Sequence, residues 1–337
     1  MKLEKYYKPK TFVYTGAYQD VSTIVHHYQY SDKAYIENEE LVENSNYKNY
    51  IQVVGLNDAA KLNKIQEMFN IEPFIMEDIL NVGQRNKFEY KDEYVFTSFN
   101  VLYFDQNHQI QKDYMSMIYL GQTVITFHET QPYYLEPLIP LLKEYQELKS
   151  HSADLLFYHI LDIITDGHLD VYDALDHQMT LFEEEILESK DMEQEAFYLV
   201  RKQMLQLKNI ISPMYEQLDK MLQRKLSVFN IDHQSYFEDL KDHLQRLESK
   251  LHQARDMMRQ LLDLHMNNQS TKMNQIMSTL TLFSAIFIPL SFLTGYFGMN
   301  FREFTALDQK YGVLIFSVMC IIIAIGMVLF FKKKKWL

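Results

Sequence analysis

The sequence predicts an α+β membrane protein with three parts along its 337 residues. Residues 1–132 alternate strand and helix patterns and predict an α/β domain. Residues 133–272 contain almost no glycine or proline and predict a stalk of long helices. Residues 273–337 predict two membrane helices, because no charged residue occurs between Lys272 and Arg302 or between Lys310 and Lys332. Each gap is long enough for the roughly 20 apolar residues of a membrane span.

Short strands are the main feature of the first part. Residues 50–54 have the composition of a strand, and Asn57 and Asp58 can cap a helix that follows it. Aromatic and β-branched residues predict further strands at 94–104, 115–120 and 123–127. Gly121 and Gln122 offer a hairpin turn before the last of these.

Three long helices are predicted by apolar residues at helical spacing, at 155–188, 193–224 and 234–297. The third segment has no glycine before Gly295 and no proline before Pro289. Helical throughout, it would extend roughly 95 Å, far more than the core of a bilayer needs. We therefore expect one helix to continue from the stalk into the membrane, with its membrane segment at about 277–297.

The second membrane helix, at about 313–331, is almost uniformly large and apolar and is expected to face lipid. A short loop separates the two helices, so they form a hairpin. Lys332 to Lys335 follow directly, and the positive-inside rule places this basic tail in the cytoplasm. The start of the chain has no apolar segment typical of a signal peptide. We expect a multi-pass protein of the inner (plasma) membrane with both termini cytoplasmic.

Composition narrows the functional classes. Six of the 33 basic and two of the 45 acidic residues lie beyond residue 272, which leaves the soluble part with 27 bases and 43 acids. This balance repels nucleic acid, and it fits either cation attraction or an ordinary solvated surface. The single cysteine, Cys320, lies in the second apolar run and excludes a thiolate metal cluster within one chain. No phosphate-binding loop, His-Glu-x-x-His or Gly-x-Ser-x-Gly pattern indicates an ATPase or another enzyme.

One face of the first membrane helix is mostly polar or small. Steps of three and four residues back from Gly298 give Gly295, Ser291, Ile288, Ser284, Thr281, Met277, Asn274, Ser270, Asn267 and Asp263. Such a stripe fits close packing in a membrane dimer, and it also fits the wall of a water-filled path. A single polar-striped helix cannot enclose a path, so conduction would require several copies around an axis.

The tripeptide Gly298-Met299-Asn300 at the outer end of this helix resembles the signature of the CorA family of divalent-cation channels. Pro289, the segment Glu77-Asp78-Ile79-Leu80-Asn81 with Gln84-Arg85, and the end Lys332-Lys333-Lys334-Lys335-Trp336-Leu337 resemble the same family. The resemblance covers essentially the whole chain. It implies a funnel-shaped homopentamer in the bilayer that conducts Mg²⁺ passively, with Co²⁺ and Ni²⁺ as lesser substrates and no prosthetic group.

Site residues follow from the resemblance. Gly298, Met299 and Asn300 would form the selectivity filter, where amide and carbonyl oxygens suit an ion that keeps its waters. The alternative is that Gly298 and Asn300 only cap the helix. The implied pore-lining residues are Asp263, Asn274, Met277, Leu280, Thr281, Ser284, Ile288, Ser291 and Gly295. The apolar members of this set would gate by dewetting.

Regulation is implied by Asp78 and Asp239, which match the two aspartates that bind intracellular Mg²⁺ between neighbouring subunits of the family. A cation between them would hold a closed state, so that Mg²⁺ inhibits its own entry. Four further aspartates recur at helical spacing and either concentrate cations or form a solvated face: Asp162, Asp166, Asp170 and Asp173.

Two departures from the family pattern bear on the substrate. Phe297 replaces the usual tyrosine before the tripeptide, and Arg302 stands where an acidic residue is frequent. A zinc transporter of the ZntB branch, which shares Gly-Met-Asn, is therefore an alternative. A membrane-anchored scaffold or sensor is an alternative from another class.

Overall fold

A computed structural model describes residues 13–38, 40–42, 46–83, 86–91, 93–188, 192–224, 229–299, 310–334 and 336. The chain forms two compact units. The first comprises Met1–Glu185 and Met192–Arg259, and the second comprises Ile186–Asp191 and Gln260–Leu337.

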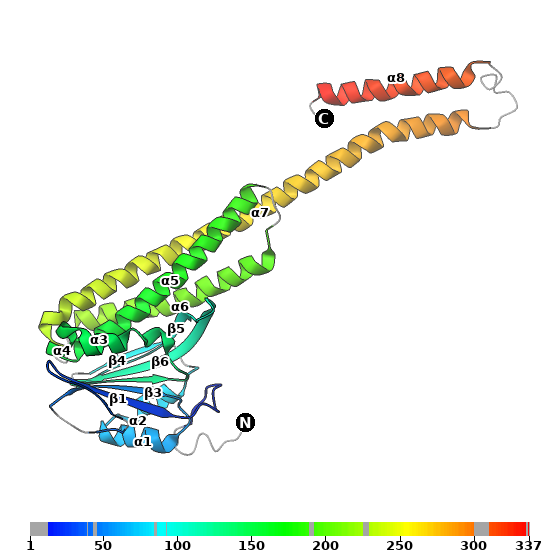
Figure 1. Ribbon diagram of the computed structural model, residues 1–337. Coiled ribbons are helices and arrows are strands. Elements are labelled where there is room, and N and C mark those ends of the chain that lie inside the picture. The colour runs from blue at the N-terminus through cyan, green and yellow to red at the C-terminus, as the bar shows by residue number, and fades with distance from the viewer. Residues whose placement is uncertain are drawn as a thin grey trace. The chain divides into compact units, whose positions relative to one another are not determined.

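The first unit is built on one sheet, which has seven strands in the described residues, in the order β2-β1-β3-β7-β6-β5-β4 (Figure 1). The strands are β1 (Ile24–Tyr30), β2 (Tyr35–Asn38), β3 (Lys48–Val54), β4 (Lys87–Tyr90), β5 (Val95–Phe104), β6 (Ile110–Leu120) and β7 (Thr123–His128). The central strands β3 and β7 pair in parallel, and the other neighbours pair antiparallel. Every residue of β3 and β7 is buried, as expected for strands covered on both faces.

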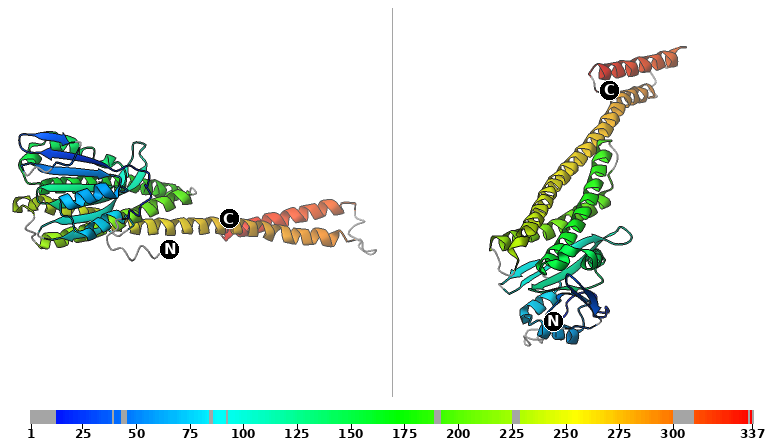
Figure 2. Two further views of the ribbon diagram at one scale, coloured as in Figure 1. Left: turned by 90° about the horizontal axis from the view of Figure 1, so that it is seen from below. Right: turned by 60° about the vertical axis from the view of Figure 1, so that its left-hand side comes forward.

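Helices cover both faces of this sheet (Figures 1 and 2). The helices of the first unit are α1 (Ala59–Met68), α2 (Pro73–Leu80), α3 (Leu138–Glu144), α4 (Gln146–Ser150), most of α5 (Asp154–Leu187), α6 (Gln194–Gln223) and the first part of α7 (Gln234–Phe297). Short 3-10 turns lie at Tyr133–Leu135 and Ile231–His233. α1 and α2 pack on one face, where Ile65 and Ile79 join Phe96, Ile125 and Phe127 of the strands in one apolar core.

Most predicted elements are confirmed. The strands predicted at 50–54, 94–104, 115–120 and 123–127 correspond to β3, β5, β6 and β7, and the long helices have nearly the predicted bounds. Asp58 caps α1 by accepting hydrogen bonds from the N–H groups of Ala60 and Lys61 at 3.0 and 3.2 Å. Gly121 has φ +59, the left-handed conformation that the hairpin turn requires. The sequence patterns do not predict β1, β2, β4 or α2, because these are short or carry polar residues on half-covered faces.

The opposite face of the sheet is tied to α5 by a buried histidine. His168 Nε2 accepts a hydrogen bond from the N–H of Leu102 in β5 at 3.2 Å, and the side chain is fully buried. Burial lowers the pKa of His168 to about 3, so the imidazole of the folded chain is neutral at neutral pH.

The buried neutral state of His168 predicts acid sensitivity. The unfolded chain protonates this residue at its ordinary pKa of about 6.5, so between pH 6.5 and 3 the unfolded state binds the extra proton and stability falls as pH falls. At pH 5 the loss should be about 2 kcal/mol relative to pH 7. We expect His168→Gln to remove this part of the pH dependence in thermal unfolding followed by circular dichroism. Equal pH slopes for wild type and variant would contradict the assignment.

The second unit contains the rest of α7 and the helix α8 (Gly312–Lys333). Among the described residues, two helical segments are long and apolar enough to cross a membrane, one ending at Phe297 and one spanning Gly312–Lys333. Their apolar windows are not buried inside the chain. α8 runs back beside the end of α7 (Figures 1 and 2), and the rings of Phe297 and Phe316 lie 5.2 Å apart.

Candidate functional site

The end of α7 carries the first part of the expected filter. Gly298 directly follows the helix, and its N–H donates to the carbonyl oxygen of Thr294 at 2.9 Å. A Cβ at position 298 would lie 3.0 Å from that same oxygen, a contact that favours glycine. Met299 is exposed, and its N–H lies 3.4 Å from the carbonyl oxygen of Tyr296. Asn300 and Arg302 lie outside the described residues.

Two opposite sides of α7 in the second unit differ in how far their residues are exposed. One row is half-covered, at Leu282, Ile286, Pro289, Leu290, Leu293 and Phe297. The expected pore stripe lies on the other side of the helix, since 3.6 residues per turn place the two rows roughly half a turn apart. Of that stripe, Ser284 is half-buried and the others are exposed: Asp263, Asn274, Met277, Leu280, Thr281, Ile288, Ser291 and Gly295. The stripe is therefore available for contact with other copies or with water.

Asp78 lies in the last turn of α2, and its side chain is only 14% exposed. The carboxylate accepts a hydrogen bond from Lys87 of β4, whose Nζ also lies 3.1 Å from Glu89 Oε2. The Tyr114 hydroxyl donates to the Asp78 carbonyl oxygen at 3.1 Å. Asp78 is thus a largely buried carboxylate with a positive partner in its own chain.

Asp239 lies in the first turns of α7 and is 57% exposed. Its Oδ2 atom is 3.6 Å from Nε2 of His243, one helical turn further on. Within the described chain, no hydrogen bond or ion pair joins Asp239 to Asp78. The two aspartates that were expected to act together are therefore separate within one copy.

The structure brings together three potential metal ligands that the sequence patterns did not connect. Asp162 and Asp166 lie one turn apart on α5, and His243 faces them from α7. One ligand atom from each lies within 4.8 Å of the other two. The helical spacing of Asp162 and Asp166 was visible in the sequence. The contribution of His243 depends on how α5 and α7 pack, which no local pattern reveals.

Charge crowding in this Asp162–Asp166–His243 cluster favours a cation. Burial raises the pKa of Asp162, and the negative charges of Asp166 and Asp239 raise it further. Burial likewise raises the pKa of Asp166, with a smaller contribution from Asp170. The His243 side chain opposes both shifts. A divalent cation among these groups would relieve the repulsion, and carboxylate with imidazole is a ligand set typical of Zn²⁺, Co²⁺ or Ni²⁺.

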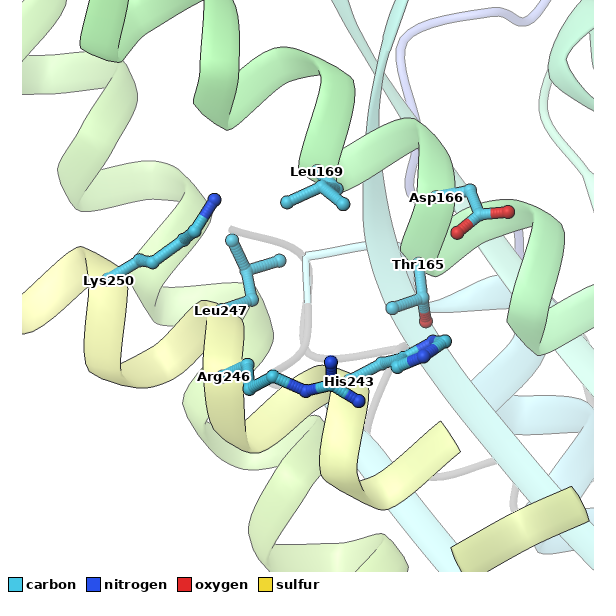
Figure 3. Close-up of a pocket in the computed structure, with 7 residues that line it drawn as sticks. All are labelled: Thr165, Asp166, Leu169, His243, Arg246, Leu247 and Lys250. Carbon is cyan, nitrogen blue, oxygen red and sulfur yellow. The ribbon is translucent and has the colours of Figure 1, made fainter. Parts of the chain in front are cut away.

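A pocket of about 220 Å³ adjoins the cluster between α5 and α7 (Figure 3). Thr165, Asp166, Leu169, His243, Arg246, Leu247 and Lys250 line it. Lys250 lies 3.4 Å from Asp173 and 5.1 Å from the ring centre of Tyr172. The Lys250 ammonium disfavours a cation at its end of the pocket, and Asp173 is already paired with it, whereas the Arg246 side chain extends toward His243 (Figure 3).

This cluster predicts selective loss of metal binding in His243→Ala. Even substitutions beside a ligand lower metal affinity about 10- to 100-fold, so removal of the imidazole should weaken Co²⁺ binding at one site per subunit by at least that much. Mg²⁺ binding should change less, because Mg²⁺ prefers oxygen ligands. Isothermal titration of the detergent-solubilised protein measures both, with His177→Ala, an exposed histidine on α5, as the control. Unchanged Co²⁺ binding in His243→Ala would exclude the cluster as a metal site.

Comparison with known proteins gives a consistent family match. A family model described as "CorA-like Mg2+ transporter protein" matches residues 48–333. The chain is 29% identical to the cobalt/magnesium transport protein CorA of Thermotoga maritima, over 98% of this chain and 96% of the relative. It is 25% identical to the zinc transport protein ZntB of Yersinia enterocolitica over 53% of this chain and 54% of the relative.

A solved structure matches the fold of most of the chain. The CorA magnesium transporter of Methanocaldococcus jannaschii superposes with a TM-score of 0.79 at 18% identity, and the match covers 94% of this chain and all of the other.

Proposed function

The chain belongs to the CorA-like Mg²⁺ transporter family, and we propose that it is a passive channel, driven by the membrane potential, that takes up mainly Mg²⁺. Co²⁺ and Ni²⁺ are the proposed lesser substrates. The family consists of divalent-cation transporters of the membrane, not enzymes. The observation that carries the proposal is the position of the polar stripe of α7, exposed and opposite the half-covered row.

The proposed assembly is a homopentamer in the inner (plasma) membrane. Five copies of α7 would surround an axis, with the polar stripe inward and α8 in an outer ring against lipid. The first unit and both termini would lie in the cytoplasm, as the basic residues after α8 favour. The bilayer, the divalent cations and other copies of the chain are then its partners, and nucleic acid is not.

The membrane potential can drive the uptake of a divalent cation without ATP. A divalent cation gains about 4.6 kcal/mol per 100 mV of inside-negative potential, twice the value for a single charge. At the outer mouth, Gly298, Met299 and Asn300 would present backbone and amide oxygens to a hydrated ion. Further in, exposed Met277 and Ile288 would form apolar constrictions that open and close to water.

Asp263 and Asn274 would add polar rings on the cytoplasmic side of the proposed pore. Both side chains are exposed on the pore side of α7 in a single copy. Five Asp263 carboxylates around one axis would repel one another, so a cation among them is favoured as it leaves the pore. This ring is distinct from the proposed regulatory site in the first unit.

We propose that regulation depends on Mg²⁺ bound between Asp78 of one subunit and Asp239 of its neighbour. Opposed carboxylates repel unless a cation lies between them, so the bound ion stabilises a closed arrangement. The Asp162–Asp166–His243 cluster adjoins Asp239 and would add to the negative potential there. Loss of the ion would remove this link between the subunits and allow the pore to open.

A Zn²⁺ transporter is the second candidate. The partial match to zinc transport proteins supports it, and so does the imidazole in the Asp162–Asp166–His243 cluster. Uptake of Mg²⁺, Zn²⁺ and Ca²⁺ into liposomes that contain the purified protein, with and without a pH gradient, distinguishes the candidates. A membrane-anchored scaffold or sensor would give no flux of any ion.

The filter predicts that Asn300→Ala abolishes Mg²⁺ uptake while the pentamer stays intact, because the mouth loses its side-chain acceptors. Fluorescent Mg²⁺ indicators in liposomes measure flux, and native mass in mild detergent measures assembly. Gln275→Ala, an exposed polar residue of α7 off the stripe, is the matched control. Unchanged flux in an intact pentamer would favour the capping role, and a native mass of one or two subunits would exclude the proposed assembly.

The regulatory site predicts that Asp239→Ala loses its sensitivity to Mg²⁺. The variant should conduct at internal Mg²⁺ concentrations that close the wild type, and its protease digestion should not change when Mg²⁺ is chelated. Asp256→Ala, which removes another exposed carboxylate of α7, should behave as wild type. If Asp239→Ala keeps the wild-type Mg²⁺ dependence of both flux and proteolysis, Asp239 is an ordinary surface residue.

A further inference from the structure

The position of Lys87 beside Asp78 shows that a cation of the chain itself already occupies one half of the proposed regulatory site. The Lys87 ammonium donates to the Asp78 carboxylate and lies 3.1 Å from Glu89 Oε2. Lys87 begins β4, the last strand in the order of the sheet, so this arrangement lies at a sheet edge next to the end of α2.

The side chains of Asp78, Lys87 and Glu89 differ in burial, which affects how readily another cation can replace Lys87 beside Asp78. Asp78 is 14% exposed, whereas Lys87 and Glu89 are 39% and 34% exposed. A largely buried carboxylate needs a positive partner, because desolvation of an uncompensated charge is costly. Lys87 remains a cation: burial lowers its pKa, but the hydrogen bonds to Asp78 and Glu89 outweigh burial and leave the pKa raised.

Glu89 is a second carboxylate that can pair with the Lys87 ammonium when it leaves Asp78. Residues 87 and 89 lie on the same face of β4, since alternate residues of a strand point the same way. The Tyr94 hydroxyl donates to Glu89 Oε1 at 3.3 Å and helps to hold that carboxylate in place. A lysine side chain is long and flexible, and it can therefore move from Asp78 to Glu89 without losing all ionic contact.

We propose that Lys87 is an internal competitor of the regulatory divalent cation, and that a cation binds Asp78 only when the Lys87 ammonium moves to Glu89. This inference rests on the proposed regulatory role of Asp78. The exchange weakens the site, so that closure requires a higher cation concentration than the two aspartates alone would need. Lys87 and Glu89 thereby set the concentration at which the channel closes.

The experiment compares full-length variants in their effect on the Mg²⁺ concentration that gives half-maximal protease protection and half-maximal inhibition of flux. Lys87→Gln removes the competitor and should lower both concentrations roughly three- to tenfold, the effect of one nearby charge on a divalent ion screened by water. Lys87→Arg keeps the charge and should stay near wild type. Glu89→Gln leaves Lys87 with Asp78 alone and should raise both concentrations.

The matched control is Lys91→Gln. Lys91 follows the same strand and pairs with Glu72, so its removal changes the net charge equally but leaves Asp78 untouched. The inference is wrong if Lys87→Gln shifts the Mg²⁺ dependence no more than Lys91→Gln does. If Lys87→Gln does not fold, Glu89→Gln decides, and an unchanged or lowered Mg²⁺ requirement in that variant overturns the inference.

Asp78→Asn separates this inference from the proposed function. If Asp78→Asn keeps the wild-type Mg²⁺ dependence, Asp78 is not a regulatory ligand, and both the regulatory site and the competition fail. If Asp78→Asn loses the dependence while Lys87→Gln and Glu89→Gln keep it, the regulatory site stands and only the competition is wrong. Opposite shifts in the two charge variants support the competition.

Discussion

Most polar groups that are removed from water need a partner, and this constraint accounts for several features of the molecule. In the sheet, the Leu102 N–H donates a hydrogen bond to the neutral ring of His168. At the end of α2, the carboxylate of Asp78 finds Lys87. In the second unit, the hydroxyl and carboxylate groups of the α7 stripe have no such partner on α8, whose residues are almost all apolar. Other copies of the chain, water or carbonyl oxygens of α7 itself can satisfy them, and the first two favour an assembly around an axis.

The same constraint explains how cations can regulate the proposed channel. The negative charges of Asp166 and Asp239 raise the pKa of Asp162, and the His243 side chain offsets this only in part. The first unit therefore carries unsatisfied negative charge near the start of α7, whereas Asp78 is already paired. A divalent cation has most to gain where a neighbouring subunit adds a carboxylate to a site that one chain leaves incomplete.

Local sequence patterns were sufficient for the long elements and for the family. Apolar residues at helical spacing predicted α5, α6 and α7 almost to their ends, and the turn at Gly121 was visible because only a few residues adopt its φ angle readily. The edge strand β4 was not predicted, since four residues carry too little periodicity. The contacts of Lys87 with Asp78 and of His243 with Asp162 could not be predicted either, because they depend on tertiary packing between distant segments. Both lie at the sites where regulation is proposed.

Basic side chains lie beside both acidic sites and would weaken the binding of a cation there. A sensor that closes a channel only when its ion is abundant must release that ion when the concentration falls, and a site of bare carboxylates would hold a divalent cation too tightly. Lys87 lies against Asp78, and Arg246 and Lys250 line the pocket that adjoins Asp166. Each positive charge lowers the affinity of the neighbouring carboxylates for a cation without removing the ligands. The affinity of such a site is thus set by the residues that compete with the ion as much as by those that bind it.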